Sequence, residues 1–291
     1  MDAANYQDWI GRSETAEDIV TSAAVRALRA TFDHEDVTVH EGDPLPPAWH
    51  WMFTNPIARQ SQLGPEGHPE RGTFFPPIEL PRRMWAGSRL EFRAPLRVGE
   101  RITRRSRIAS IQPKTGSTGA LVFVTVRHEI TSGSGGCTID EQNIVWREEA
   151  KGANPVSARR EAPPGTSDFS RTVEPDPVML FRFSALTFNG HRIHYDQPYV
   201  TQVEGYPGLV VHGPLVALFM LDLFTRHHPY AQIAGFEFSG KRPITLPTAM
   251  AAHCRREAGH YALWVEAEGA VASTGRLTLA GASKPEGAEN P

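Results

Sequence analysis

The amino-acid sequence predicts an α+β protein of two related halves, each an antiparallel sheet wrapped around a long apolar helix. The first observation is that each half contains a helical stretch followed by a series of strand-like segments. The second is that similar strings, Leu90-Glu91-Phe92 and Phe236-Glu237-Phe238, open the two series about half a chain apart. The third is a stretch without apolar periodicity, residues 151–168, which predicts a linker between the halves.

The N-terminal half, residues 1–150, begins with a predicted helix over residues 14–31. Its apolar residues recur at helical spacing, with acids early and arginines late, as the helix dipole favours. Residues 42–88 are rich in Pro, Gly and aromatic side chains, and we expect them to be irregular. Alternating segments with β-branched residues then predict four strands, near residues 89–96, 101–112, 119–131 and 138–147.

The C-terminal half, residues 169–291, opens with a predicted helix near residues 177–188 and has a second, almost wholly apolar helix over residues 209–224. The second helix is shorter than the roughly 20 residues that span a bilayer. We therefore expect it to be buried in a folded core, because a curved sheet can cover most of its circumference. This arrangement, repeated, is the tandem or double hot-dog architecture. The remaining strands are expected near residues 233–240, 249–257, 260–269 and 271–280.

Composition and charge exclude several classes of protein. The 291 residues include 40% apolar and 22% charged residues, and the net charge is −3, so we expect a globular protein that binds neither nucleic acid nor a membrane. Two widely spaced cysteines, Cys137 and Cys254, make neither a disulfide framework nor a zinc cluster. The first residues are polar and acidic, unlike a secretory signal, so we expect a cytoplasmic protein.

Candidate chemistry is concentrated in the segment FNGHRIHYD, residues 188–196. Two histidines, His191 and His194, stand three residues apart and follow Asn189. Such residues are either catalytic or ordinary hydrogen-bonded residues of a turn. No third Cys, His or acidic residue stands at a familiar zinc spacing, so we expect no metal.

A second candidate feature is the start of the apolar helix, in the string GLVVHGPL of residues 208–215. Pro214 suits the first turn of a helix, where its missing N–H is not needed. Gly213 then lies at the helix start with an unpaired N–H and the positive end of the helix dipole, where it can polarise a carbonyl oxygen. We expect His212 to be structural or to support the site from behind.

The segment of residues 188–196 resembles the hydratase motif of the MaoC-like, R-specific enoyl-CoA hydratases, which reads roughly G-D-x-N-P-L-H. With the final His of that motif on His194, Asn189 stands at the catalytic Asp of the family and His191 at its Asn. The later H-G pair of the family, which supplies an oxyanion-hole N–H, falls on His212 and Gly213.

Longer strings resemble the subgroup that contains mesaconyl-C4-CoA hydratase and the mitochondrial 3-hydroxyacyl-thioester dehydratases. They are PPIELPRRMWAG at residues 76–87, SALTFNGHRIHYD at 184–196 and GYPGLVVHGPL at 205–215. That subgroup is described as a double hot dog whose N-terminal half lacks the catalytic motif, and residues 1–150 likewise contain no such string. The resemblance implies a hydro-lyase that adds water to an α,β-unsaturated thioester, or removes it from a 3-hydroxyacyl thioester, without a cofactor.

The departure from the family pattern lies at Asn189, because an amide cannot exchange a proton as a carboxylate does. Three readings are open. Asn189 positions the water while His194 transfers the protons, which we favour; or His191 shares this work; or Asp196, two residues past His194, orients an imidazole.

Three arginines are candidate substrate ligands. Arg82 and Arg83 lie in the Pro-rich stretch, and Arg192 lies between the two histidines. Each is either a solvated or bracing charge or a ligand of a CoA phosphate or substrate carboxylate, which guanidinium groups recognise by forked hydrogen bonds.

The leading substrate class implied by the resemblance is a branched C4 dicarboxylyl CoA thioester. Dehydration of a 3-hydroxyacyl group on acyl carrier protein (ACP) is the alternative within the same chemistry. Thioester hydrolysis is disfavoured, since the apolar helix has no acid before Asp222. A non-catalytic acyl-thioester-binding protein is the alternative of another class, favoured by Asn189. The two half-sheets can pair with each other, and a homodimer of such units is a further expectation.

Overall fold

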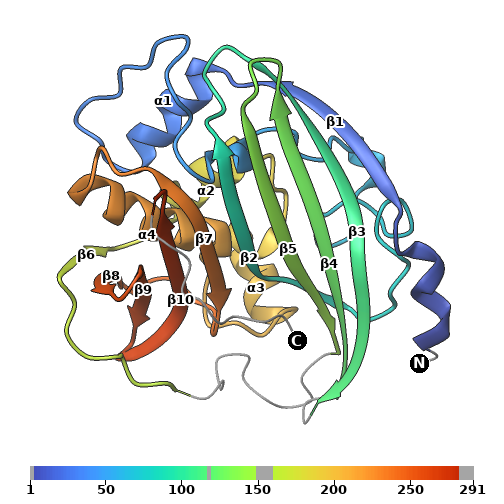
Figure 1. Cartoon of the computed structure of the whole chain (residues 1–291). Helices are drawn as coiled ribbons and strands as arrows, with labels where there is room; N and C mark the ends of the chain where they lie inside the picture. Colours follow the sequence, from blue (N-terminus) through green and yellow to red (C-terminus); the bar gives the residue numbers. More distant parts are fainter. Residues whose placement is uncertain (1–2, 117–118, 149–159, 282–291) are drawn as a thin grey trace.

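The computed structural model describes residues 3–116, 119–148 and 160–281. Its strands form one ten-stranded sheet in the order β1-β3-β4-β5-β2-β7-β10-β9-β8-β6, and every neighbouring pair in it is antiparallel. The sheet is strongly curved, and the helices lie behind it in Figure 1, on one side. The predicted α+β class is confirmed.

The strand order is the same in both halves. Counted inward from either edge, each half runs first, third, fourth, fifth and second strand. In the N-terminal half these strands are β1 Ser13–Ile19, β2 Arg82–Ala94, β3 Arg101–Gly116, β4 Gly119–Ser132 and β5 Cys137–Arg147. In the C-terminal half they are β6 Phe169–Val173, β7 Ile233–Gly240, β8 Met250–Glu257, β9 His260–Ala267 and β10 Ala270–Leu279. The eight strands predicted from the sequence are all present.

The two half-sheets join through β2 and β7, where Arg89 pairs with Glu237 and Glu91 with Gly235. The strings that suggested a duplication therefore lie in the corresponding second strands of the two halves. On this repeated order we propose that the chain divides into halves at residues 1–150 and 169–291. Of the expected linker at 151–168, residues 151–159 lie outside the described residues, and residues 160–168 form no helix or strand.

Four α-helices are described: α1 Ser22–Thr31, α2 Pro177–Leu186, α3 Gln197–Gln202 and α4 Gly213–His227. Helix α4 confirms the predicted apolar helix, although it begins at Gly213 because residues before it are extended, with Val210 bridged to Thr245. All ten residues from Leu215 to Phe224 are buried. The helix packs against β2, β8, β9 and β10, so the curved sheet covers it as expected. In the part of the chain that the structure describes, no helix is long and apolar enough to cross a membrane.

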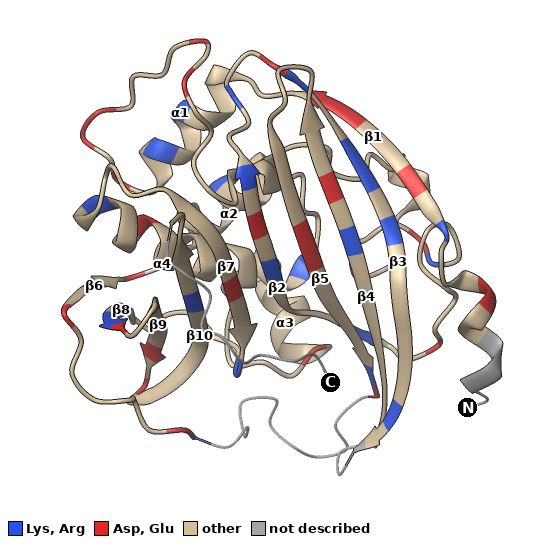
Figure 2. Cartoon of the chain, in the orientation of Figure 1, with Lys and Arg blue, Asp and Glu red and all other residues tan. Residues whose placement is uncertain are grey.

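The predicted helix over residues 14–31 is wrong in its first third. Residues Ser13–Ile19 form edge strand β1, with alternating burial, and only Ser22–Thr31 are helical. The acidic residues that suggested a helix start instead pair across the sheet edge with the basic strand β3, as in Glu14 with Arg104 and Glu17 with Arg101. Figure 2 shows these red and blue bands side by side. The charge pattern is cross-strand complementarity, which helix-period counting does not detect.

The N-terminal half has no counterpart of the length of α4, since α1 has ten residues. Aromatic residues of the irregular stretch contribute to its core instead, around the 3-10 helix Trp49–Met52. A buried polar cluster fixes them: Asp140 accepts hydrogen bonds from Trp51 Nε1 at 2.8 Å and from Gln142 Nε2 at 2.7 Å. The predicted irregular stretch, residues 42–88, is wrong at its end, because residues 82–88 belong to strand β2.

Candidate active site

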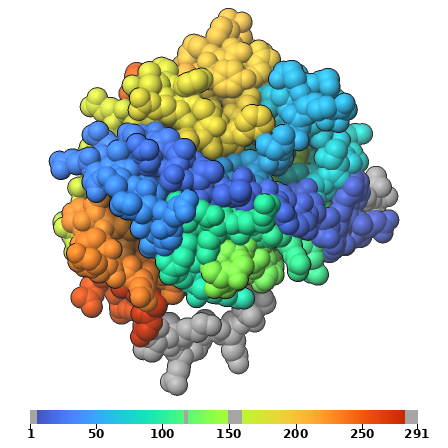
Figure 3. Space-filling view, turned by 90° about the horizontal axis from the view of Figure 1, so that it is seen from above, coloured from blue at the N-terminus to red at the C-terminus, as the bar shows by residue number. Residues whose placement is uncertain are grey.

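A cavity of about 1350 Å³ lies between the two halves. Its lining includes the motif segment of residues 188–195, the start of α4, the loop of residues 63–69 and the first residues of β2. The N-terminal loop meets the motif directly, since Arg192 N–H donates to the Glu66 carbonyl at 2.9 Å. In the space-filling view the gold surface near residue 200 abuts the light-blue surface near residue 60 (Figure 3). Both halves therefore contribute to the wall.

His194 is buried in the 3-10 helix Arg192–His194 and lines the cavity. Its Nδ1 lies 2.7 Å from the Val210 carbonyl oxygen. A carbonyl only accepts, so Nδ1 carries the proton and Nε2 has a free lone pair. In the described part of the chain nothing hydrogen-bonds to Nε2. Burial lowers the pKa of His194 to about 4, against the opposing effect of the Val210 carbonyl, so the imidazole is neutral at physiological pH.

Behind His194 stands His212, the residue that precedes α4. The two rings stack with centroids 3.5 Å apart and an interplanar angle of 16°. His212 is held by Ser184, whose Oγ lies 2.9 Å from Nε2. Burial keeps the pKa of His212 well below its ordinary value, so a second neutral ring supports the first. The expectation that His212 supports the site from behind fits this position.

Gly213 is the first residue of α4, and Pro214 follows it in the first turn. Its N–H has no partner among the described residues, as the geometry of a helix N-terminus predicts. The side chain of Trp85 passes close by: a Cβ on residue 213 would lie 2.9 Å from Trp85 Cε3. Glycine is required here because the ring and the helix end approach so closely.

Asn189 shapes the turn that presents the histidines. Its Oδ1 accepts a hydrogen bond from the N–H of His191 at 3.0 Å, which is a local side-chain turn. This use of Oδ1 leaves the amide NH₂ group, a donor, for the cavity that Asn189 lines.

Two further imidazoles lie beside the stacked rings of His194 and His212. They belong to His191 and to His68, a histidine that the sequence did not single out. The His68 and His191 ring centroids are 4.4 Å apart, and those of His191 and His194 are 5.6 Å apart. Burial, with nearby positive charge, lowers the pKa of His191 to about 2 and that of His68 well below its ordinary value. Among the described residues, no group of three or more His, Cys, Asp or Glu side chains has an arrangement suited to a metal ion.

His68 reaches the site because its loop packs tightly on the motif turn. A Cβ on Gly67 would lie 2.0 Å from the Gly190 carbonyl oxygen, and Gly67 has a φ of +92°. Only glycine allows both the backbone conformation and the close approach. The string GPEGHP carries Gly and Pro as turn signals, but nothing in it indicates which other segment the turn meets.

Both carboxylate oxygens of Asp196 are bound to groups other than an imidazole. Asp196 caps α3 by accepting from the Tyr199 N–H at 3.0 Å. Its other oxygen accepts from Arg192, at 3.0 Å from Nε and 2.8 Å from a terminal nitrogen. Arg192 also donates to the Pro65 carbonyl at 3.0 Å, so this arginine braces the motif against the N-terminal loop.

The other two candidate arginines lie at the start of strand β2, not in a loop. Arg82 donates to the Glu204 carbonyl at 2.9 Å, and its Nε lies 3.8 Å from the Glu204 carboxylate. Arg83 has no hydrogen bond or ion pair to any described residue, although it lines the cavity. Burial lowers the pKa of Arg83 to about 10, and its guanidinium is still charged at neutral pH.

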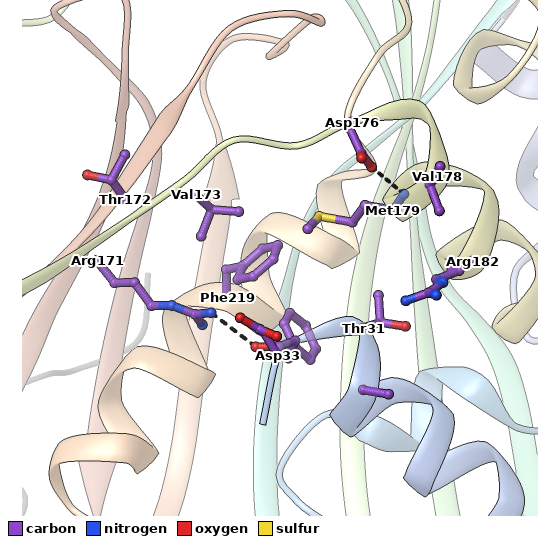
Figure 4. Close-up of a pocket in the computed structure, with 12 residues that line it drawn as sticks. Thr31, Asp33, Arg171, Thr172, Val173, Asp176, Val178, Met179, Arg182 and Phe219 are labelled. Atoms are coloured by element: carbon purple, nitrogen blue, oxygen red, sulfur yellow. Dashed lines mark hydrogen bonds between the residues drawn. The ribbon is translucent and has the colours of Figure 1, made fainter. Parts of the chain in front are cut away.

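A second, smaller cavity of about 400 Å³ lies where α1, β6, α2 and α4 meet (Figure 4). Arg171 of β6 spans it, donating to the Phe32 carbonyl at 3.0 Å and pairing with Asp222 at 2.6 Å. Asp176 caps α2 by accepting from the Met179 N–H at 2.7 Å (Figure 4). None of the motif residues lines this cavity, and its polar groups hold helices together.

Comparison with solved structures defines the class of protein. A Mycobacterium tuberculosis protein described as a double hot-dog fold superposes with a TM-score of 0.58 at 12% identity, over 93% of this chain and 96% of that chain. The chain is therefore a double hot-dog protein, as the sequence predicted.

Sequence comparison defines the family. A family model described as hydroxyacyl-thioester dehydratase type 2 matches residues 48–246. The mesaconyl-C4-CoA hydratase of Chloroflexus aurantiacus is 48% identical over 84% of this chain and 86% of that protein. The mitochondrial hydroxyacyl-thioester dehydratase type 2 of Schizosaccharomyces pombe is 27% identical over 86% of this chain and 91% of that protein. The chain belongs to the hydroxyacyl-thioester dehydratase type 2 family, within the MaoC-like hydratases, and is a hydro-lyase of thioesters.

Proposed function

We propose that this protein adds water to the double bond of an unsaturated, branched C4 dicarboxylyl CoA thioester, as the name of its Chloroflexus relative indicates for that protein. The observation that carries the proposal is the pairing of two groups in one cavity. The free Nε2 of His194 and the free N–H of Gly213 are linked through the ring of His212, which stacks on His194 and directly precedes Gly213.

The reaction follows from these two groups. Nε2 of His194 accepts a proton from water, and the oxygen of that water bonds to the β carbon of the thioester. The electron pair of the double bond moves toward the thioester, and negative charge develops on its oxygen. The N–H of Gly213 stabilises that charge, a contribution worth roughly 10²–10³ in rate for one such donor. The α carbon then receives a proton from the His194 imidazolium, so the product contains the substrate plus one water.

Asn189 supports this scheme as a positioning residue for water. Its NH₂ group donates a hydrogen bond to the attacking water, and Oδ1 stays on the His191 N–H. The other imidazoles, His68 and His191, have pKa values lowered by burial and by their neighbours, so they act as neutral polar walls. Proton transfer then depends on His194 alone.

The two cysteines, Cys137 and Cys254, are both free. Free thiols fit a reducing compartment, and we propose that the protein is located in the cytoplasm.

A hydration assay with His194→Ala tests the function. Loss of absorbance of the conjugated thioester is followed for short, branched, dicarboxylyl and long enoyl-CoA substrates, with wild type and variant. We expect wild type to turn over the dicarboxylyl thioester best, and His194→Ala to be slower by at least about two orders of magnitude while remaining folded. Near-native turnover by the variant would overturn the role of His194. Binding of CoA esters by wild type without any turnover would favour the non-catalytic alternative.

A further inference from the structure

We propose that Arg83 is the anion subsite of this cavity and binds the free carboxylate of a dicarboxylyl thioester, which makes it the residue that selects acidic over neutral acyl groups. The proposal rests on the proposed function and deepens it, since it names the group that binds the carboxylate at the end of the acyl chain opposite the thioester.

Arg83 differs from the other arginines near the motif. Arg192 is bound by Asp196 and Pro65, and Arg82 by Glu204. The guanidinium of Arg71 donates to the backbone carbonyls of residues 78, 80 and 81. Arg83 has no such partner in the described ranges, and its Cζ lies 5.9 Å from the centroid of the Phe75 ring. Its donors therefore face the cavity unused.

The place of Arg83 on β2 puts its charge at a suitable distance from the thioester site. Arg83 and Trp85 are two residues apart on one strand, so their side chains project to the same face, about 7 Å apart. Trp85 is the side chain that touches Gly213. The terminal carbons of an extended four-carbon chain are roughly 4 Å apart, and a hydrogen bond adds about 3 Å. The length of a C4 dicarboxylyl group with its thioester oxygen at Gly213 is therefore suited to a contact between its free carboxylate and Arg83.

Strand pairing leaves this end of β2 open toward the cavity. Strand β7 pairs with β2 only from Gly87 to Glu91, whereas β5 pairs with it from Arg82 onward. Residues 82–86 therefore have a strand neighbour on one side only. Residues 82–86 all line the cavity, so a ligand in it can approach Arg83 without displacing a strand.

The charge of Arg83 has no ion-pair partner among the described residues. Its neighbours His68 and His191 are neutral, because their pKa values are lowered by burial and by positive charge nearby, including that of Arg83 itself. Glu66 is the nearest acidic influence on Arg83, but it lies outside the 4.0 Å range of an ion pair. A buried unpaired charge is costly, so binding of a carboxylate is favoured and binding of a neutral acyl chain is not.

The test compares kcat/KM for mesaconyl-C4-CoA, which has a free carboxylate, with that for crotonyl-CoA, which is neutral and equally long. Arg83→Gln should lower the value for the acidic substrate by at least about 100-fold, the loss expected when one partner of a buried charge pair is removed. The value for crotonyl-CoA should stay within about threefold, and Arg83→Lys should restore part of the loss. Arg89→Gln, on the same strand but exposed and outside the cavity lining, is the matched control.

Dead-end inhibitors show whether Arg83 binds the acyl carboxylate or the 3′-phosphate of CoA. Succinyl-CoA and butyryl-CoA differ in the carboxylate, and their dephospho-CoA forms lack the 3′-phosphate. If Arg83→Gln weakens inhibition by succinyl-CoA only, with or without the phosphate, the carboxylate subsite stands. Equal weakening of both thioesters that disappears in the dephospho forms assigns Arg83 to CoA and overturns the proposal, as does an equal loss of turnover for both substrates. If wild type hydrates no enoyl-CoA yet still discriminates succinyl-CoA through Arg83, the proposed function fails and the subsite survives.

Discussion

At the scale of single residues, Asn189 has two uses that the sequence pattern alone does not separate. Its Oδ1 holds the motif turn by accepting from the His191 N–H, and its NH₂ group remains for the cavity. A carboxylate at the same position would keep the first use and replace the donor of the second by an acceptor. The departure from the MaoC-like pattern therefore leaves the turn intact and, in the proposed scheme, changes how water is held.

Substitution of Asn189 separates these uses. Asn189→Asp should keep the protein folded and retain kcat within about tenfold, because the turn is preserved and a carboxylate can also hold a water. Asn189→Ala should lower kcat by about 10-fold to 100-fold, since both the turn contact and the water contact are lost. Steady-state hydration rates and the melting temperature of both variants are measured side by side. If Asn189→Ala matches wild type in rate, Asn189 does not position water.

The sequence predicts some site residues and misses others for a physical reason. Local sequence patterns predict four of the site residues. Three of them, Asn189, His191 and His194, are close together in the chain, and Gly213 is identified by the proline that follows it. His68, which the sequence did not single out, and Trp85, whose place beside Gly213 it did not predict, come from the other half of the molecule. Their approach to the motif depends on the packing of Gly67 on Gly190 and of Trp85 on Gly213, and no local pattern encodes a contact between distant segments.

At the scale of elements, the start of α4 is positioned by the ring of Trp85. Gly213→Ala would place a Cβ 2.9 Å from Trp85 Cε3, so either the helix end or the ring has to move. The N–H at position 213 is kept, but its aim at the thioester oxygen changes. We expect kcat to fall by roughly 10-fold or more, since small misplacements of catalytic groups are costly.

A second-site change checks this cause. Phenylalanine lacks the outer part of the indole ring, so Trp85→Phe combined with Gly213→Ala should recover a large part of the lost kcat. The comparison of the two single variants with the double variant measures the coupling between the positions. Additive losses, without recovery, would show that contact with Trp85 is not the reason for glycine at 213.

Element prediction succeeds where burial follows a simple period. The strands predicted near residues 119–131 and 249–257 alternate clearly in burial, and the apolar run of α4 is unbroken. Strand β1 and the five-residue strand β6 were missed, because each is a half-exposed edge strand stabilised by a neighbour distant in sequence. Strand β6 pairs with β8, as in Phe169 with Cys254. Such edges depend on tertiary context more than on propensity.

At the scale of the whole molecule, the two halves of the double sheet contribute different parts of the site. Both halves keep the strand order, but within the described residues only the C-terminal half has a long buried helix, whose N-terminus carries the proposed oxyanion donor. The N-terminal half contributes the walls of the same cavity through residues 63–69 and β2. The sequence indicated this division through the absence of the motif in residues 1–150 and through the candidate ligands Arg82 and Arg83 in that half, whereas the way the walls of the cavity meet follows from the three-dimensional packing.

The cavity also makes global stability depend on pH. His68, His191, His194 and His212 all have pKa values lowered by burial, with His194 at about 4 and His191 at about 2. In the unfolded chain each has a pKa of about 6.5. Between about pH 6.5 and 4 the unfolded state therefore binds more protons than the folded state. The free energy of unfolding must fall as pH falls through this range, by up to roughly 1.4 kcal/mol per pH unit for each histidine.

Urea unfolding between pH 7.5 and 5.0 measures this dependence. The pKa of Asp140 is also lowered, to about 2, because hydrogen bonds and charges from His50 and its neighbours outweigh the burial that would raise it. Its contribution is complete above about pH 4 and is lost only below that value, so it does not affect the chosen range. His194→Gln should make the slope shallower by about one proton. A free energy of unfolding that stays constant from pH 7.5 to 5.5 would mean that burial does not lower the pKa values of the cavity histidines.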